Sequence, residues 1–325
     1  MQQNEHPHVS PAFEGFELAT FGTLHDGRVT DLNGHWPDTT LLVGEGMGIT
    51  EIVGAIAGLR QVGPRHWAST ADASVSYPAT GHITLSAVEN SSFWFAHRNR
   101  VIASLVRETP PGGPVLDVGG GTGFVSAGLI AAGFPSVVVE PGKDGVQSCV
   151  SRGVPVVAAP FQDLSIFPGS IPAVGMFDVL EHIEDDAGAL SKVHQALAPG
   201  GLLYLAVPAG NWLWSHADVQ SGHFRRYGES ALKALLDGAG FATVRATYFF
   251  SPLVLPLFLL KSLPHRFFRG RDFTQETVSA EHRLPDNFAG RLIDAWLSRE
   301  ASHIEKGGSV PLGTSLLVTA RKRAD

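Results

Sequence analysis

Three glycines at alternate positions, Gly119, Gly121 and Gly123, follow shortly after the acidic residue Asp117. Glycine has no Cβ, so a loop with this spacing lets the backbone come close to a ligand. The apolar residues around Asp117 predict a buried strand before the loop, and residues 124–132 predict a helix after it. The first N–H groups of such a helix remain available to a ligand. The pattern therefore predicts a nucleotide-type cofactor site between a strand and a helix.

The glycine spacing separates two classes of cofactor loop. A dinucleotide loop follows G-x-G-x-x-G, which would need glycine where this chain has Phe124 or Ser126. An acid so near the loop would repel a pyrophosphate but can serve a sulfonium-bearing amino acid. The run V-L-D-V-G-G-G-T-G resembles motif I of the class I S-adenosylmethionine-dependent methyltransferases. The resemblance implies that Asp117 and the glycines bind S-adenosylmethionine, with S-adenosylhomocysteine as product.

A second acid ends the next expected strand. Glu140 follows three valines and stands 23 positions after Asp117. An acid at this place in a Rossmann-like unit can accept hydrogen bonds from both ribose hydroxyls. The resemblance implies that Phe161 and Gln162 flank the adenine, and that Phe177 also contacts the cofactor.

Strand and helix signals alternate along the middle of the chain. The expected strands are 115–118, 137–140, 154–158, 171–177 and 202–207, then 242–250 and 314–320. Such alternation predicts a doubly wound parallel sheet with ligands beyond the carboxyl ends of its strands. The expected fold is α/β: a Rossmann-like, seven-stranded class I methyltransferase sheet with helices on both faces. The resemblance implies that the last two strands are antiparallel.

Four regions are expected along the chain. They are an N-terminal accessory domain over 1–85, a cofactor-binding core over 86–250, a helical lid insertion over 251–313, and the last core strand with the tail over 314–325. The insertion is too long to be a plain loop. Another strand–glycine–helix signal over residues 40–59 lacks a following acid-terminated strand, so we interpret it as a tight turn in the accessory domain.

Two polar blocks lie where expected strands end. Residues 178–186 resemble the L-E-H-x-x-D signature of many small-molecule methyltransferases. Residues 214–227 resemble a W-S-x-x-D-x-x-x-G-H-x-R-R-Y block of a bacterial class I group, and residues 311–316 match its P-x-G-x-S-L ending. The longer block mixes histidines, an acid, arginines and aromatic rings, which core packing does not demand.

These blocks supply the candidate catalytic and substrate-binding residues. A general base helps when the methyl acceptor carries a proton, and histidine suits that role near neutral pH. His223 is the first candidate, then His182 or His216, with Asp218 placed to orient a histidine. A purely structural role for His223 and Arg226 is the alternative. Arginines can bind an anionic substrate group. The expected substrate-binding residues are Trp214, Arg225, Arg226 and Tyr227.

Residues 93–102 predict a helix that leads into the first strand. In one interpretation, Trp94 closes over the cofactor and Arg98 binds its carboxylate. In the other, the helix packs ordinarily and its arginines are exposed. The sequence leaves both open.

Composition limits the remaining classes. The chain has 325 residues, a formal net charge of −7 and one cysteine, Cys149. The acidic balance argues against a nucleic-acid partner. A single cysteine excludes an intramolecular disulfide and a cysteine zinc site. No H-x-x-x-H or similar spacing is present, so no metal is expected. Cys149 is expected to be a small buried residue inside a helix.

The longest apolar run, residues 248–260, has 13 residues and two prolines. It is too short for a membrane span of about 20 residues, although the basic residues after it would suit peripheral membrane contact. We prefer a strand followed by a packed lid helix. Residues 1–11 show no secretory signal, so a cytoplasmic protein is expected. The N-terminal segment or the insertion would also allow a homodimer.

The hypothesis from sequence is an S-adenosylmethionine-dependent methyltransferase that acts on a small molecule, such as a natural-product or lipid-linked intermediate. Two alternatives stay open. One is a cyclase or lyase that binds the cofactor without methyl transfer, and the other is a non-catalytic partner subunit with the same fold. The glycine spacing disfavours a third, an NAD-linked oxidoreductase.

Overall fold

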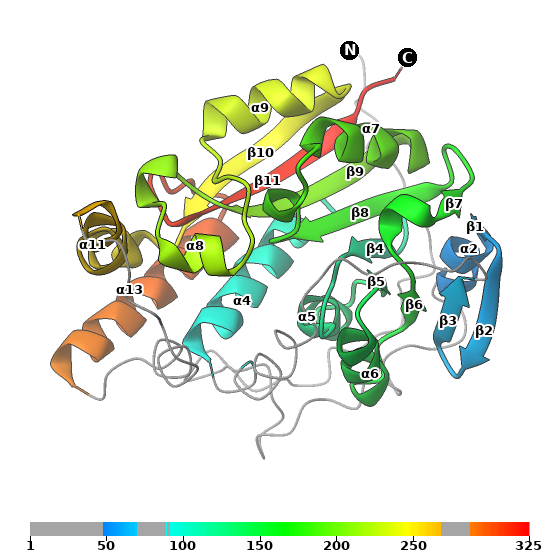
Figure 1. The fold of residues 1–325 in the computed structure, drawn as a ribbon, viewed down its shortest axis with the longest axis horizontal. Coiled ribbons are helices and arrows are strands. Elements are labelled where there is room, and N and C mark those ends of the chain that lie inside the picture. Colours follow the sequence, from blue (N-terminus) through cyan, green and yellow to red (C-terminus); the bar gives the residue numbers. More distant parts are fainter. Residues whose placement is uncertain (1–47, 70–88, 90–91, 268–286, 325) are drawn as a thin grey trace, which may run out of the picture.

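A nine-stranded sheet forms the centre of the computed structural model, which describes residues 48–69, 89, 92–267 and 287–324 (Figure 1). The strand order is β10-β11-β9-β8-β4-β5-β6-β3-β2. The first seven in this order correspond to the expected sheet: β4 (Val115–Val118), β5 (Ser136–Glu140), β6 (Val156–Ala158), β8 (Ile171–Phe177), β9 (Leu197–Pro208), β10 (Phe241–Phe249) and β11 (Ser315–Lys322). Strand β11 runs antiparallel to both β9 and β10, and the other five strands are parallel. The class I arrangement is therefore confirmed.

The described part of the N-terminal segment extends this sheet. Strand β3 (His66–Ser69) pairs in parallel with β6, and β2 (Leu59–Gly63) pairs antiparallel with β3. Before them lie helix α2 (Ile49–Gly54) and strand β1 (Ile56–Ala57), and β1 pairs with β7 (Ser165–Ile166). The strand expected at residues 40–43 and the boundary expected near residue 85 lie outside the described residues. An accessory domain over 1–85 stays a prediction.

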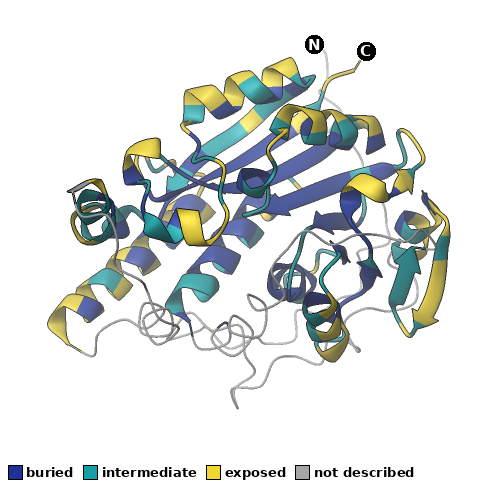
Figure 2. Cartoon of the chain, in the orientation of Figure 1, coloured by how far each residue is buried: buried dark blue, intermediate teal, exposed yellow. Residues whose placement is uncertain are grey.

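Helices cover both faces of the sheet, as predicted. One face carries α4 (Phe93–Glu108), α5 (Phe124–Ala131), α6 (Lys143–Ser151) and α13 (Phe288–Glu305). The other carries α2, α7 (Asp186–Ala196) and α9 (Glu229–Gly238). The central strands are buried on both sides, so their residues are apolar almost without interruption (Figure 2).

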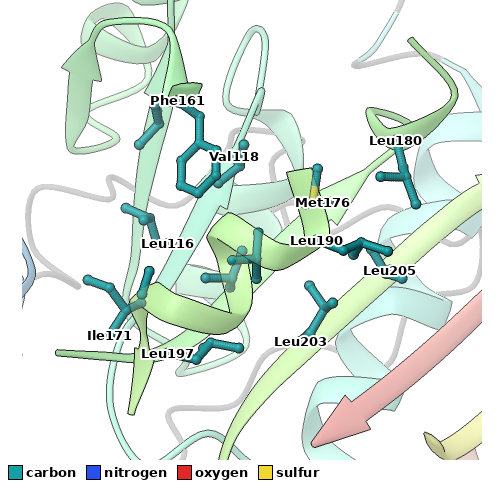
Figure 3. Close-up of a cluster of buried hydrophobic side chains, with 14 of the residues drawn as sticks. Leu116, Val118, Phe161, Ile171, Met176, Leu180, Leu190, Leu197, Leu203 and Leu205 are labelled. Atoms are coloured by element: carbon teal, nitrogen blue, oxygen red, sulfur yellow. The ribbon is translucent and has the colours of Figure 1, made fainter. Parts of the chain in front are cut away.

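Alternation along the strands divides the core into layers. Figure 3 shows one layer, in which Leu116 and Val118 of β4 share a cluster with Leu190 of α7 and with Leu203 and Leu205 of β9. The intervening residues of these strands point to the opposite face, where Val115 and Tyr204 meet helix α4. These packed layers hold the carboxyl ends of the strands in fixed positions.

The chain reverses its direction across the sheet at β4. From β4 it proceeds outward through β5 and β6, and it then returns to the other side of β4 with β8 and β9. Loops that leave a parallel sheet at such a reversal diverge and create a crevice for ligands. The loop after β4 and the segment after β8 therefore lie where a ligand is expected.

The described part of residues 251–313 is largely helical. It contains η5 (Ser251–Leu253), α10 (Val254–Leu257), the π-helix η6 (Phe258–Ser262), α11 (Leu263–Phe267) and α13. A helical lid is thus consistent with the structure but remains a prediction. Among the described residues, no helix is both long enough and apolar enough to cross a membrane.

Candidate functional site

The glycine loop between β4 and α5 forms the tight turn that its spacing predicts. Gly119, Gly121 and Gly123 have φ angles of 66°, 55° and 76°, in a region that side chains with a Cβ rarely adopt. The loop also has little room for a side chain, because a Cβ on Gly119 would lie 2.9 Å from Cγ2 of Val179. A Cβ on Gly123 would lie 2.8 Å from Sγ of Cys149. Both backbone conformation and packing therefore require glycine here.

Asp117 lies beneath this loop and is almost fully buried, with 1% of its surface exposed. Its Oδ2 accepts a hydrogen bond of 2.7 Å from the Ser126 hydroxyl, while its Oδ1 has no partner among the described residues. Burial raises the pKa of Asp117 to about 6, because desolvation disfavours the charged carboxylate. Asp117 thus offers a buried acceptor atom beside the loop.

Glu140 connects the loop to the next strand. Its Oε2 accepts from the Gly121 N–H at 2.9 Å, and its Oε1 accepts from the Gly142 N–H at 2.7 Å. A carboxylate oxygen has more than one acceptor position, so these bonds leave capacity for further donors. The structure therefore places Glu140 at the loop, and its expected contact with ribose hydroxyls stays a prediction.

Arg98 reaches from α4 to the end of β8. Its Nη2 donates to the Phe177 carbonyl at 2.8 Å and pairs with Asp178 at 2.7 Å. The side chain is buried, so the interpretation that the arginines of this helix are all exposed is wrong for Arg98. Asp178 itself has a φ of 57°, a strained backbone conformation of the kind that clusters at functional sites. Trp94 stacks on Phe250 with ring centroids 3.9 Å apart.

The two residues expected to flank adenine differ in exposure. Phe161 is buried and has the Lys192 ammonium 5.5 Å from its ring centre, whereas Gln162 is exposed. Both belong to η2 (Phe161–Asp163), which directly follows β6 on the same side of β4 as Glu140.

Asp218 organises the histidine block after β9. It lies in α8 (His216–Gln220), whose first turn is closed by a capping box with Ser215. One carboxylate oxygen, Oδ1, lies 2.9 Å from Nδ1 of His223 and 2.7 Å from Nε of Arg226. Burial alone would raise the pKa of Asp218, but the bonds from His223 and Arg226 outweigh it and lower the pKa to about 2. Asp218 is therefore an anion that fixes the His223 ring.

Two of the three candidate histidines meet, and the third does not. The rings of His182 and His223 lie edge to face with centroids 4.7 Å apart. Burial, together with the neighbouring His223, lowers the pKa of His182 to about 4, which keeps that ring neutral at pH 7. His216 instead faces His265 of α11, at 6.2 Å.

Glu181, for which the sequence pattern predicted no role, lies beside this histidine pair. One ligand atom from each of Glu181, His182 and His223 lies within 4.8 Å of the other two. Glu181 is 1% exposed, and neither carboxylate oxygen has a hydrogen-bond partner in the described part of the chain. Burial raises the pKa of Glu181 well above its ordinary value. The spacing of residues in the sequence did not predict a set of metal ligands here, because His182 and His223 are 41 positions apart.

The predicted substrate-binding residues mostly hold the loops together. Arg225 pairs with Asp186 at 2.5 Å and donates to the Glu184 carbonyl. The Tyr227 hydroxyl lies 3.0 Å from Asp186 as well, and burial raises its pKa. Together with Arg226, these contacts support the structural alternative for this block. Trp214 is half-buried, and its substrate contact stays a prediction.

The fold and the loop together define a class of protein. The sheet ends in an antiparallel pair, the glycine loop follows its central strand, and acids flank that loop. Residues 94–246 match the methyltransferase domain family. This match covers a little under half of the chain, and it agrees with the class I S-adenosylmethionine-dependent methyltransferase arrangement of the sheet and its glycine loop.

Individual relatives carry the same description. A probable S-adenosylmethionine-dependent methyltransferase of Mycolicibacterium smegmatis is 28% identical over 169 residues, which cover 50% of this chain and 65% of that protein. A similarly described protein of Mycobacterium tuberculosis is 29% identical over 182 residues, covering 54% and 65%. The chain thus spans less than two thirds of these curated relatives. Phosphoethanolamine N-methyltransferase 2 of Haemonchus contortus superposes with a TM-score of 0.48 and 19% identity, covering 77% of this chain and 59% of that one.

Proposed function

We propose that this chain transfers the methyl group of S-adenosylmethionine to a small-molecule acceptor. One observation carries the proposal: the loop between β4 and α5, with its three positive-φ glycines, lies against two carboxylates, Asp117 beside Gly120 and Glu140 beside Gly121. A tight glycine loop with two nearby acids suits a ligand that has a ribose and a positively charged amino-acid part.

The residues present fit this cofactor. Glu140 would hold the ribose, Phe161 and Gln162 would flank the adenine, and Asp117 and Arg98 would serve the amino-acid end. The Oδ1 atom of Asp117 is a buried acceptor for which the described residues supply no donor. When bound, S-adenosylmethionine supplies a methyl group on a sulfonium, so the protein chiefly needs to align the acceptor with it.

The acceptor would bind over the polar segments after β8 and β9. The glycine loop follows β4. Strand β8 pairs with β4, and β9 pairs with β8, so the segments after β8 and β9 begin at the same edge of the sheet as the glycine loop. These segments carry Asp178, Glu181, His182 and His223, which suit an acceptor with polar groups. In this proposal His223, held by Asp218, orients the acceptor or receives its proton.

The experiment is calorimetric titration of S-adenosylhomocysteine into the full chain and its Glu140→Gln variant. We expect micromolar binding by the wild type and at least tenfold weaker binding by the variant, because the amide oxygen cannot replace a carboxylate that accepts on both sides. Glu229→Gln is the matched control. Its carboxylate pairs with Lys233, one turn along α9 and away from the glycine loop, so the affinity of this variant should equal that of the wild type.

The alternatives give different outcomes. Absent binding of S-adenosylhomocysteine by a folded wild type, or preferential binding of NAD, would refute the proposal. Cofactor binding followed by acceptor turnover without release of S-adenosylhomocysteine would instead indicate a cyclase or lyase. The acceptor screen should therefore measure that product directly.

A further inference from the structure

We infer that Glu181, His182 and His223 form a binding site for one divalent transition-metal ion, such as Zn²⁺ or Mn²⁺, at the edge of the sheet beyond β8 and β9. The inference goes beyond methyl transfer, since it depends on this cluster and not on the cofactor loop. Candidate ligand atoms of the three side chains lie within 4.8 Å of one another. An ion bound at ~2.1 Å in tetrahedral geometry brings its ligands to roughly 3.4 Å apart, which small side-chain rotations would achieve.

The pairing of charges around the cluster leaves one acid without a cation. Three neighbouring carboxylates each have an arginine within 2.7 Å: Asp178 with Arg98, Asp186 with Arg225, and Asp218 with Arg226. Glu181 has no such partner in the described part of the chain, and both of its oxygens are buried without a hydrogen-bond donor. Buried charges are normally paired or bound to a metal. The unsatisfied group is therefore a carboxylate that faces two imidazole rings.

Both imidazole rings are held in a way that suits metal binding. Nδ1 of His223 lies 2.9 Å from the anionic Asp218, so the ring donates its proton there and turns its other nitrogen away from Asp218. His182 hydrogen-bonds to the backbone of Gly222, next to His223 in the chain. Histidine ligands of metals commonly donate their second N–H to a carboxylate or a backbone carbonyl, which fixes the tautomer and the ring orientation.

The types of ligand decide which ion would bind. Two imidazoles and one carboxylate favour zinc and first-row transition ions over Mg²⁺ and Ca²⁺, which prefer all-oxygen sites. Three protein ligands leave coordination positions open, as in catalytic rather than structural metal sites. An acceptor with an anionic oxygen would fit such a position.

The test measures metal binding by the full chain. After treatment with a chelator, the protein is equilibrated separately with Zn²⁺, Mn²⁺ and Mg²⁺, and bound metal is measured by mass spectrometry and calorimetry. We expect one Zn²⁺ or Mn²⁺ per chain and weaker binding of Mg²⁺. Glu181→Gln and His223→Gln should each weaken binding at least tenfold. Asp218→Asn leaves all three proposed ligands in place but weakens the support of His223, together with the contacts of Asp218 to Arg226 and Ser215, and should reduce metal affinity about 10–100-fold.

Glu184→Gln is the matched control, because Glu184 is exposed and lies three positions from Glu181. It should bind metal as the wild type does. Absent binding, or binding that Glu181→Gln and His223→Gln leave unchanged, would overturn the inference. Titration of S-adenosylhomocysteine into the same samples checks folding. It also separates the two proposals: retained cofactor binding without metal overturns only the metal site, and the reverse overturns only the proposed function.

Discussion

Gly123 shows how a single residue limits what the cofactor loop can tolerate. It precedes the first turn of α5 with a left-handed φ of 76°, and a Cβ there would lie 2.8 Å from Sγ of Cys149. Cys149 is fully buried in α6, as the sequence predicts, and desolvation raises its pKa, which disfavours a reactive thiolate. Gly133, at the other end of α5, has a similar φ of 88° but nothing within 4 Å of an added Cβ.

These two glycines allow backbone strain to be separated from crowding. We expect Gly133→Ala to lower the free energy of unfolding by about 1–2 kcal/mol, from the left-handed conformation alone. Gly123→Ala adds the clash with Cys149, so it should cost about 1–3 kcal/mol more and reduce affinity for S-adenosylhomocysteine. Urea denaturation and calorimetry measure the two effects. Equal losses of stability in both variants would show that the packing against Cys149 is unimportant.

At the scale of elements, a buried hydrogen bond between His97 and Glu300 joins α4 to α13 across more than 200 residues of sequence. Nε2 of His97 lies 2.9 Å from Oε1 of Glu300. The Glu300 carboxylate also accepts two backbone hydrogen bonds, from the Phe250 N–H at Oε1 and from the Ser251 N–H at Oε2. Burial would raise the pKa of Glu300, but the bonds from His97 and Ser251 lower it overall. Glu300 thus fixes the turn at which the chain leaves β10, where Phe250 has a φ of 60°.

An exposed ion pair between the same two helices can be compared with the buried contact of Glu300. Arg100 and Glu305 are 2.6 Å apart, but their side chains are 34% and 32% exposed. Glu300→Ala should lower the free energy of unfolding by about 3–5 kcal/mol, because it leaves His97 and two buried N–H groups without a partner. Glu305→Ala should cost less than about 1 kcal/mol, since water solvates the remaining arginine. Urea denaturation of both variants measures these costs, and similar small losses would contradict the role assigned to Glu300.

At the scale of the whole molecule, the glycine loop begins at β4, the central strand of the nine-stranded sheet. Two buried clusters on opposite faces of this sheet join its central strands to helices α4, α5, α7, α9 and α13. A ligand that binds only the folded state adds its binding free energy to the stability of the entire cooperative unit. Ligand binding at the loop should therefore raise the free energy of unfolding of the whole sheet.

Thermal unfolding tests this connection. At S-adenosylhomocysteine concentrations of 100 times Kd, the added stability is about 2.7 kcal/mol, which should raise Tm by several degrees. Circular dichroism and tryptophan fluorescence should show the same shift, and Glu140→Gln should remove most of it. A ligand-dependent shift seen by one probe alone would mean that the sheet does not unfold as one unit.

Local sequence rules predicted the elements well, because their physical causes are local. The strand expected over residues 171–177 is found with the same bounds in β8. The glycine spacing predicted the tight turn after β4, since only glycine adopts its φ angles readily. The alternation of strands and helices then predicted the parallel sheet and the edge at which a ligand is expected.

Only the tertiary structure decided which side chains meet. His182 and His223 become neighbours through the segments that follow β8 and β9, two strands that pair in parallel. Glu181 is buried beside them with neither carboxylate oxygen hydrogen-bonded among the described residues, and Arg98 is buried where it pairs with Asp178. Likewise, β3 joins the sheet beside β6, although about 90 residues separate them in the chain. The sequence by itself determined the class of fold and its cofactor loop, because turns, caps and periodicity act between neighbours. The composition of the cluster around Glu181, His182 and His223 depended on burial and on contacts between distant segments, which exist only once the sheet has formed.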